Sequence, residues 1–218
     1  MKVLICCSGY SIQQVDQWDL STHTVIAVNN AWARVKWDYF CCTSDYQNEY
    51  DKEIGFPEGL VKIDYTDPKP NENWFSQETL MQAVAKCGGW AKCGQGISLA
   101  AAYCALTYFK GLTQIGFIGA DMVYNADSDK TAYYGKGIDF KKRGVSDPTK
   151  MARDERNRRG RELNTHFNRL WADLSDDEII FYLYKRLEIF ANNTYGVDVI
   201  NYSSLENSML PYEFKPYA

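Results

Sequence analysis

Several short apolar runs of this sequence are each followed directly by small or polar residues that could bind a ligand. Serine and asparagine side chains can hydrogen-bond ribose hydroxyls and base edges, and a glycine lets a ligand approach the backbone closely. A carboxylate in such a place could bind Mg²⁺ or accept a proton from an attacking hydroxyl. The residues that follow the runs are Ser8, Gly9, Tyr10 and Ser11, then Asn29 and Asn30, Ser44 and Asp45, Gly119 and Asp121, and Asn201 and Ser203.

Each of these segments also has a purely structural explanation. The SGYS stretch that begins at Ser8 could be an ordinary strand-to-helix turn, since it is neither a G-x-G-x-x-G fingerprint nor a P-loop. Asn29 and Asn30 could be turn formers, and Asp45 and Asp121 could be helix caps. The functional interpretation depends on all of them meeting at one edge of one sheet.

The elements that would create this edge follow from the hydrophobic pattern. Short apolar runs alternate with helical patterns, which predicts an α/β fold: a single Rossmann-like domain over residues 1–218, with a mostly parallel sheet flanked by helices on both faces. Residues 65–76 are predicted to form a loop, because they carry two prolines and several polar residues. The strands are expected at 2–7, 24–28, 37–42, 60–64, 114–118, 179–184 and 197–200, and the helices at 97–110 and about 151–174.

An imidazole could serve as the general base. The chain has two histidines, of which His166 lies in the predicted charged helix and His23 lies just before the second strand, away from the ligand edge. A lone helical histidine is more often a surface or packing residue, but His166 is the candidate that could take a proton near neutral pH. Asp121 is the substitute, and His23 is expected to be structural.

An irregular excursion is expected around residues 124–160. Its tyrosines, Tyr133 and Tyr134, could close over a bound phosphate as part of a lid, or they could be surface aromatics. Most of the chain's basic excess lies at 141–161, where Lys141 and Arg143 could stabilise phosphate charge. The same run could instead be a solvated helix face, paired internally by acidic neighbours.

Composition excludes some classes of protein. The chain of 218 residues has a net charge of -4, so it is not basic overall, although the segment 141–161 leaves nucleic acid possible as a partner. No apolar stretch reaches membrane-spanning length, and the N-terminal run is too short for a secretory signal. The seven cysteines lack the C-x-x-C spacing of a zinc site. We therefore expect reduced thiols, no resident metal and a cytoplasmic location.

The order of these segments resembles two related families. The stretches VIAVNNAW and WDYFCCTSDY, the glycine entry into an alanine-rich helix, and KGLTQIGFIGADMVY are similar to the bacterial lipooligosaccharide sialyltransferases. The ending VINYSSLENSML resembles the terminal pattern of the hydroxymethylpterin pyrophosphokinase-like family, which shares that Rossmann-type fold. The first loop departs from the Gly-Asn-Gly-Pro of the sialyltransferases, so the resemblance does not transfer their preference for a cytidine nucleotide.

The resemblance implies roles for particular residues. It aligns the first loop with a nucleotide-binding loop, Asn29 with an asparagine that contacts the nucleotide, and His166 with the catalytic base. The other positions that it aligns are Ser8, Gly9 and Ser11, the helix entry at Gly96 and Ser98, the Gly-x-Asp segment at Gly119 and Asp121, and the lid tyrosines Tyr133 and Tyr134.

Three hypotheses follow. The first is a glycosyltransferase that moves a sugar from a nucleotide-sugar donor to a hydroxyl acceptor, either a glycan or a modified base in DNA. The second is a pyrophosphokinase-type phosphotransferase that uses ATP with Mg²⁺ held by Asp45 or Asp121. The third is a non-catalytic module that binds a nucleotide or nucleic acid, in which case affinity for DNA falls steeply with salt.

Overall fold

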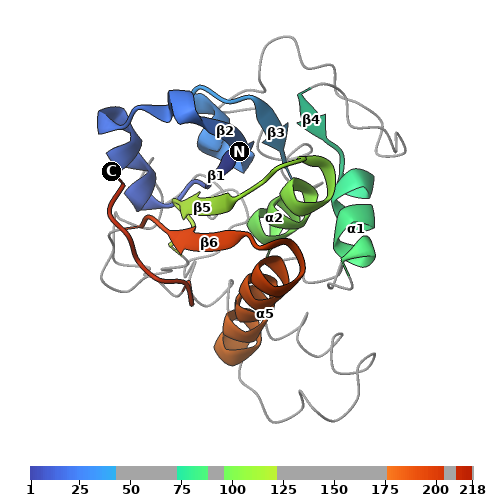
Figure 1. Ribbon diagram of the computed structural model, residues 1–218. Helices are drawn as coiled ribbons and strands as arrows, with labels where there is room; N and C mark the ends of the chain where they lie inside the picture. Colours follow the sequence, from blue (N-terminus) through green and yellow to red (C-terminus); the bar gives the residue numbers. More distant parts are fainter. Residues whose placement is uncertain (43–72, 88–95, 122–175, 204–209, 218) are drawn as a thin grey trace, which may run out of the picture.

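The described residues form six parallel strands in one sheet (Figure 1). The computed structural model describes residues 1–42, 73–87, 96–121, 176–203 and 210–217. The sheet has the order β4-β3-β2-β1-β5-β6, so the chain moves outward from β1 to β4 and then crosses to the other side of β1. The strands are β1 (Lys2–Cys6), β2 (His23–Val28), β3 (Tyr39–Cys41), β4 (Trp74–Phe75), β5 (Gln114–Ile118) and β6 (Asp198–Asn201).

The central strand β1 is apolar because both of its faces are covered. Val3 and Ile5 point into one hydrophobic layer, while Leu4 and Cys6 point into the other. All four side chains are buried, as expected for a strand in the middle of a parallel sheet. β1 pairs in register with β2 on one side and with β5 on the other, from Lys2 to Cys6.

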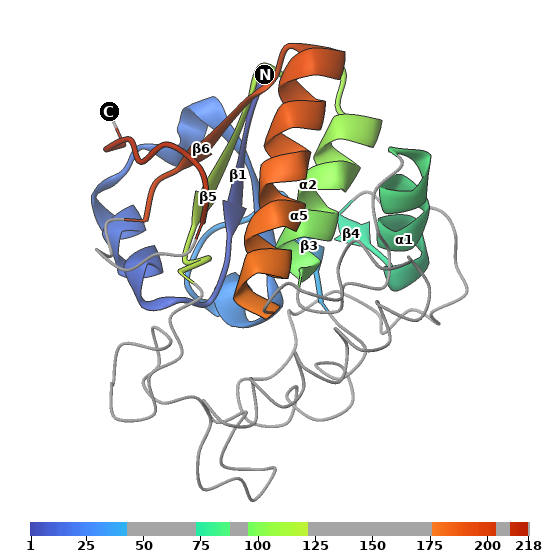
Figure 2. The same cartoon turned by 90° about the horizontal axis from the view of Figure 1, so that it is seen from below.

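In the described part of the chain, three α-helices cover one face of the sheet (Figure 2). They are α1 (Gln77–Lys86), α2 (Ile97–Tyr108) and α5 (Asp176–Phe190), and η5 (Ala191–Tyr195) continues α5. α2 is buried along most of its length, and its alanines allow close approach to the sheet. No described helix has both the length and the apolar character needed to cross a membrane.

The opposite face is covered differently. Two 3₁₀ segments, η1 (Tyr10–Gln17) and η3 (Asn29–Ala33), pack there, and the short η2 (Leu20–Thr22) precedes β2. In η1 the buried apolar residues are Ile12 and Val15, three positions apart, which is the spacing that a 3₁₀ turn places on one side. Within the described residues, helices therefore cover both faces as predicted, and those on the second face are 3₁₀ helices.

One predicted strand is wrong. Residues 179–184 were expected to form a strand, but they lie within the helix α5. The apolar run IIFYLY is too short to distinguish a strand from a buried helix turn. The distinguishing signal lies further along, because Leu183, Tyr184, Leu187 and Ala191 form a buried stripe with helical spacing.

The other expectations have mixed outcomes. The predicted strands at 2–7, 24–28, 37–42, 114–118 and 197–200 and the helix at 97–110 are confirmed to within a few residues. β4 lies inside the predicted loop 65–76, and α1 was not predicted. The expected strand at 60–64, the helix at 151–174 and the excursion at 124–160 fall outside the described residues.

The C-terminal residues 210–217 run around the outer edge of β6. Their backbone bonds to Asn201, which accepts from Lys215 N at 3.0 Å and donates to Glu213 O at 3.1 Å. Tyr212 packs on the face with the α-helices, 5.3 Å from the Phe117 ring centroid, and Tyr217 stacks on Trp18 at 4.2 Å on the opposite face. The tail thus pairs the backbone groups of Asn201, at the carboxyl end of this edge strand.

Substitution of α5 residues tests its packing. Leu187 is fully buried, whereas Ile189 on the same helix is 53% exposed. We expect Leu187→Ala to lower the free energy of unfolding by about 2–5 kcal/mol, because it removes buried methyl groups and leaves a cavity. Ile189→Ala should change it by no more than about 0.5 kcal/mol. Equal effects in urea unfolding would contradict the placement of this helix.

Candidate functional site

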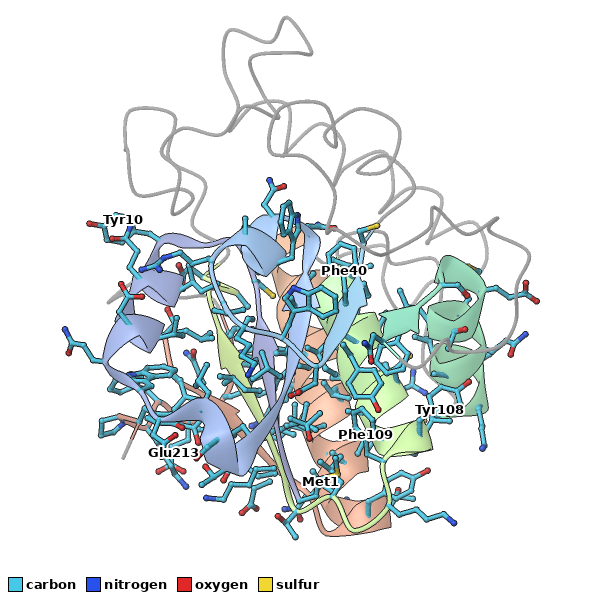
Figure 3. All side chains as sticks on the ribbon, turned by 90° about the horizontal axis from the view of Figure 1, so that it is seen from above. Met1, Tyr10, Phe40, Tyr108, Phe109 and Glu213 are labelled. Atoms are coloured by element: carbon cyan, nitrogen blue, oxygen red, sulfur yellow. The ribbon has the colours of Figure 1, made fainter. Side chains whose placement is uncertain are left out.

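The candidate site lies at the carboxyl ends of β1, β5 and β6. The order of the sheet changes direction between β1 and β5, and at such a point the connections leave toward opposite sides and open a crevice. Figure 3 shows Tyr10, at the start of η1 after β1, at the opposite end of the sheet from Met1. Backbone pairing continues past the strand ends, since Cys7 N donates to Ile118 O at 2.8 Å and Gly9 N donates to Gly119 O at 2.7 Å.

The Asp121 carboxylate joins the loops that follow these three strands. It is 1% exposed. One oxygen accepts a hydrogen bond from Ser11 N at 2.9 Å, and the other accepts from the hydroxyls of Ser11 and Ser203. Ser11 Oγ in turn accepts from Gly119 N at 2.9 Å. A buried carboxylate needs hydrogen-bond partners, and these bonds fix the relative positions of the three loops.

The two glycines at this place are required by the loops themselves. A Cβ atom on Gly9 would lie 2.3 Å from Gly119 O and 2.5 Å from Asp121 Oδ2. Gly119 has a φ of +70°, and a Cβ there would lie 2.1 Å from Cys7 O. The sequence suggested that Gly9 makes room for a ligand, but the structure shows that both glycines make room for the neighbouring loop.

The end of β6 directs a hydroxyl toward the carboxylate. Asn201 Oδ1 accepts a hydrogen bond from Ser203 N at 2.9 Å, which closes a local turn of the kind that asparagine favours. Both residues are buried. They therefore reach the predicted site, where Asn201 shapes the turn and Ser203 bonds to Asp121.

The end of β2 carries an unusual backbone conformation. Asn29 has a φ of 51°, and it is the non-glycine residue with positive φ in the described part of the chain. Asparagine tolerates this left-handed region better than most residues, but the conformation is still less favourable than the helical or extended regions. Such a conformation is kept where the surroundings impose it, which occurs often at binding sites. Asn30, next to it, is buried at the start of η3.

The entry into α2 lies close to the cluster formed by Ser11, Asp121 and Ser203. The Ser98 side chain at this entry is buried and points toward α5. Gly96 is the residue before the helix, and Ser98 Oγ lies 2.7 Å from Tyr184 OH on α5. Burial raises the pKa of the neighbouring Cys7 thiol to about 12, opposed by a hydrogen bond with Ser98 and reinforced by the Asp121 charge. Ser98 thus connects α2 to α5 and β1. Tyr184 was missed from the sequence because its run was assigned to a strand.

Ser8 differs from the other residues of the first loop. Its Oγ atom is buried and has no hydrogen-bond partner. A buried hydroxyl without a partner is uncommon in native proteins, because losing its bonds to water costs free energy. The position of Ser8, directly before Gly9, places this hydroxyl at the point where the sheet order changes direction.

The structure places part of the predicted site. The structure brings together Ser8, Gly9, Ser11, Gly119, Asp121 and Ser203, with Asn201 and Ser98 beside them. Ser44, Asp45, Tyr133, Tyr134, Lys141, Arg143 and His166 lie outside the described residues, so the roles predicted for them stay predictions.

Two further expectations concern histidine and metal. His23 is the first residue of β2, at the amino end of the sheet, and its ring lies 5.4 Å from Tyr217. Burial and the nearby Lys2 charge lower the His23 pKa. The position of His23 at the start of β2 confirms the prediction that it lies away from the ligand edge. Over residues 1–42, 73–87, 96–121, 176–203 and 210–217, no group of three or more His, Cys, Asp or Glu side chains is arranged to hold a metal ion.

Substitution of Gly9 tests the contact between the two loops. Gly9 has an ordinary φ of -64°, so the cost of Gly9→Ala is steric. We expect a loss of about 3 kcal/mol in the free energy of unfolding, at the upper end of overpacking costs. Gly111→Ala is the control, because Gly111 has a φ of +68° with nothing within 4 Å. It should cost about 1 kcal/mol from backbone strain alone. A Gly9→Ala variant as stable as the control would contradict the contact.

Thiol labelling tests whether the cluster around Asp121 is closed to solvent. Burial raises the pKa of Cys6, Cys7, Cys41 and Cys104, so these thiols stay protonated and unreactive at about pH 8. We expect mass spectrometry to find them unmodified after iodoacetamide treatment of the folded protein and modified after treatment in concentrated urea. Rapid labelling of Cys7 in the folded protein would mean that the cluster is open to solvent.

Comparisons with known proteins add no relative from which a function could be transferred. No protein-family model matches the chain, and no curated protein or solved structure matches it either. The geometry at the carboxyl ends of β1, β5 and β6 is therefore the basis for assigning a function.

Proposed function

We propose that the chain binds a nucleotide-activated sugar at the carboxyl ends of β1 and β5 and transfers the sugar to a hydroxyl acceptor. The observation that carries the proposal is the joining of three strand-end loops by the Asp121 carboxylate, at the point where the sheet order changes direction. In Rossmann-like sheets a nucleotide occupies this crevice. The six parallel strands described here supply the same type of edge.

The described residues support binding more directly than catalysis. The Asp121 oxygens already accept three hydrogen bonds, and the carboxylate is almost fully buried. This arrangement favours a role as an anchor over a role as proton acceptor. Under the proposal, His166 takes the proton of the acceptor hydroxyl.

In the transfer step, one group of residues would accept the proton of the acceptor hydroxyl, and another would stabilise the negative charge on the departing nucleotide. The acceptor oxygen attacks the anomeric carbon of the sugar, the bond from that carbon to the phosphate oxygen breaks, and its electron pair stays on the departing nucleotide. Lys141, Arg143, Tyr133 and Tyr134 are the residues proposed to stabilise that negative charge. A glycan or a modified base in DNA would serve as acceptor, and DNA would use the basic run 141–161.

The anchoring role of Asp121 also bears on the phosphotransferase hypothesis. That mechanism needs carboxylate oxygens for Mg²⁺, and those of Asp121 are engaged by Ser11 and Ser203. It therefore depends on Asp45, which lies outside the described residues. The glycosyltransferase proposal has no such requirement.

A thermal-shift screen against CMP, UDP, GDP, ADP and ATP, each with and without Mg²⁺, tests the proposal. A ligand present at 100 times its Kd stabilises the folded state by about 2.7 kcal/mol, which raises the Tm of a chain of this size by about 5–10 °C. We expect stabilisation by CMP, UDP or GDP without metal. Stabilisation by ATP only with Mg²⁺ would favour the phosphotransferase, and no shift with any nucleotide would contradict nucleotide binding.

The Asn29→Gly variant separates the backbone role of Asn29 from binding. Glycine adopts a φ of 51° without strain, so the free energy of unfolding should stay within about 1 kcal/mol of the original or rise. Loss of one hydrogen bond to the nucleotide should weaken binding by up to about tenfold. The control is Asn193→Gly on exposed η5, which should leave binding unchanged. Unchanged affinity in Asn29→Gly would remove Asn29 from the site.

A further inference from the structure

The first loop has already committed the backbone groups that a phosphate would need. The N–H groups of Cys7 and Gly9 donate to Ile118 O and Gly119 O, the Ser11 N–H donates to Asp121, and the Ile12 N–H donates to Gly9 O. Phosphates are held at such turns by several successive N–H groups that point at the same anion. Between Cys7 and Ile12, no two successive N–H groups are left for a ligand.

The charge at this place is also unfavourable for an anion. Asp121 Oδ2 lies so close behind the loop that a Cβ on Gly9 would approach it to 2.5 Å. A phosphate bound against Gly9 would lie next to a buried carboxylate, where repulsion is weakly screened by water. The hydrogen bonds from Ser11 and Ser203 hold this carboxylate in place beside the loop.

A neutral hydrogen-bonding group is available at the same point. Ser8 Oγ is buried without a partner, directly before Gly9. A hydroxyl can donate one hydrogen bond and accept others, so its natural complement is another neutral hydroxyl. This combination of committed N–H groups, a buried carboxylate and an uncommitted hydroxyl suits the uncharged part of a nucleotide.

We infer that the first loop is the subsite for the ribose of the bound nucleotide, with Ser8 Oγ hydrogen-bonded to a ribose hydroxyl and the phosphates bound elsewhere. The inference rests on the proposed function, because it assigns one part of the same ligand to one loop. It differs from the usual use of the loop after a first strand, which is to hold phosphate. The phosphate charge must then be neutralised by residues outside this loop.

The experiment uses calorimetry to measure the binding of cytidine, uridine, guanosine and adenosine, the nucleosides of the nucleotides in the thermal-shift screen. It also measures their 2′-deoxy and 3′-deoxy forms and inorganic pyrophosphate. The full chain is compared with its Ser8→Ala variant and with Ser21→Ala, a control on exposed η2 at the amino end of the sheet. We expect one deoxy form of the preferred nucleoside to bind the unmodified chain about tenfold more weakly than the ribonucleoside. Ser8→Ala should abolish that difference, and Ser21→Ala should keep it.

The outcomes separate this inference from the proposed function. If nucleotides bind but Ser8→Ala retains the difference between ribose and deoxyribose, the ribose subsite is wrong while nucleotide binding stands. The same conclusion follows if Ser8→Ala weakens pyrophosphate binding, which would assign the loop to phosphate. If Ser8→Ala changes only the Tm, its hydroxyl binds an internal water and the inference falls. If no nucleoside or nucleotide binds the unmodified chain, both the proposed function and the subsite fall.

Discussion

A buried carboxylate connects three loops of this molecule that lie far apart in sequence. Asp121 receives Ser11 from the loop after β1 and Ser203 from the loop after β6, and its own loop follows β5. A buried charge is stable only when it is hydrogen-bonded, so the three loops must meet in one arrangement. Gly9 and Gly119 permit this arrangement because side chains at either position would overlap the opposing backbone.

Whether a strand or helix could be predicted from the sequence depended on how many of its faces are buried. β1, β2 and β5 are covered on both faces, so they appear as continuous apolar runs and were predicted nearly to the residue. α5 was misassigned because its first apolar residues form an unbroken run, and its helical spacing is evident only as far as Ala191. β4 has two residues and makes no pattern of its own.

The candidate site was predicted in its composition but not in its internal chemistry. The strand-end rule correctly selected Ser11, Asp121 and Ser203 as neighbours. It could not indicate that these residues bond to one another, because spacing along a chain does not show which donors a loop uses internally. Cys7 and Tyr184 were missed for a related reason: each belongs to an apolar run, and only the tertiary contacts bring them beside Ser98 and Asp121.

The position of β1 has a consequence for how the chain reaches its folded state. β1 precedes the other described strands in the chain, but one of its two neighbours is β5, and the Ser11–Asp121 bonds close over 110 residues. On the ribosome, the apolar edge of β1 therefore stays without this partner until the 110 residues that follow Ser11, up to Asp121, have been added. Contacts of such high contact order slow folding and expose a growing chain to misassociation. The centre of the sheet therefore begins with β1 and is completed only when β5 has been made.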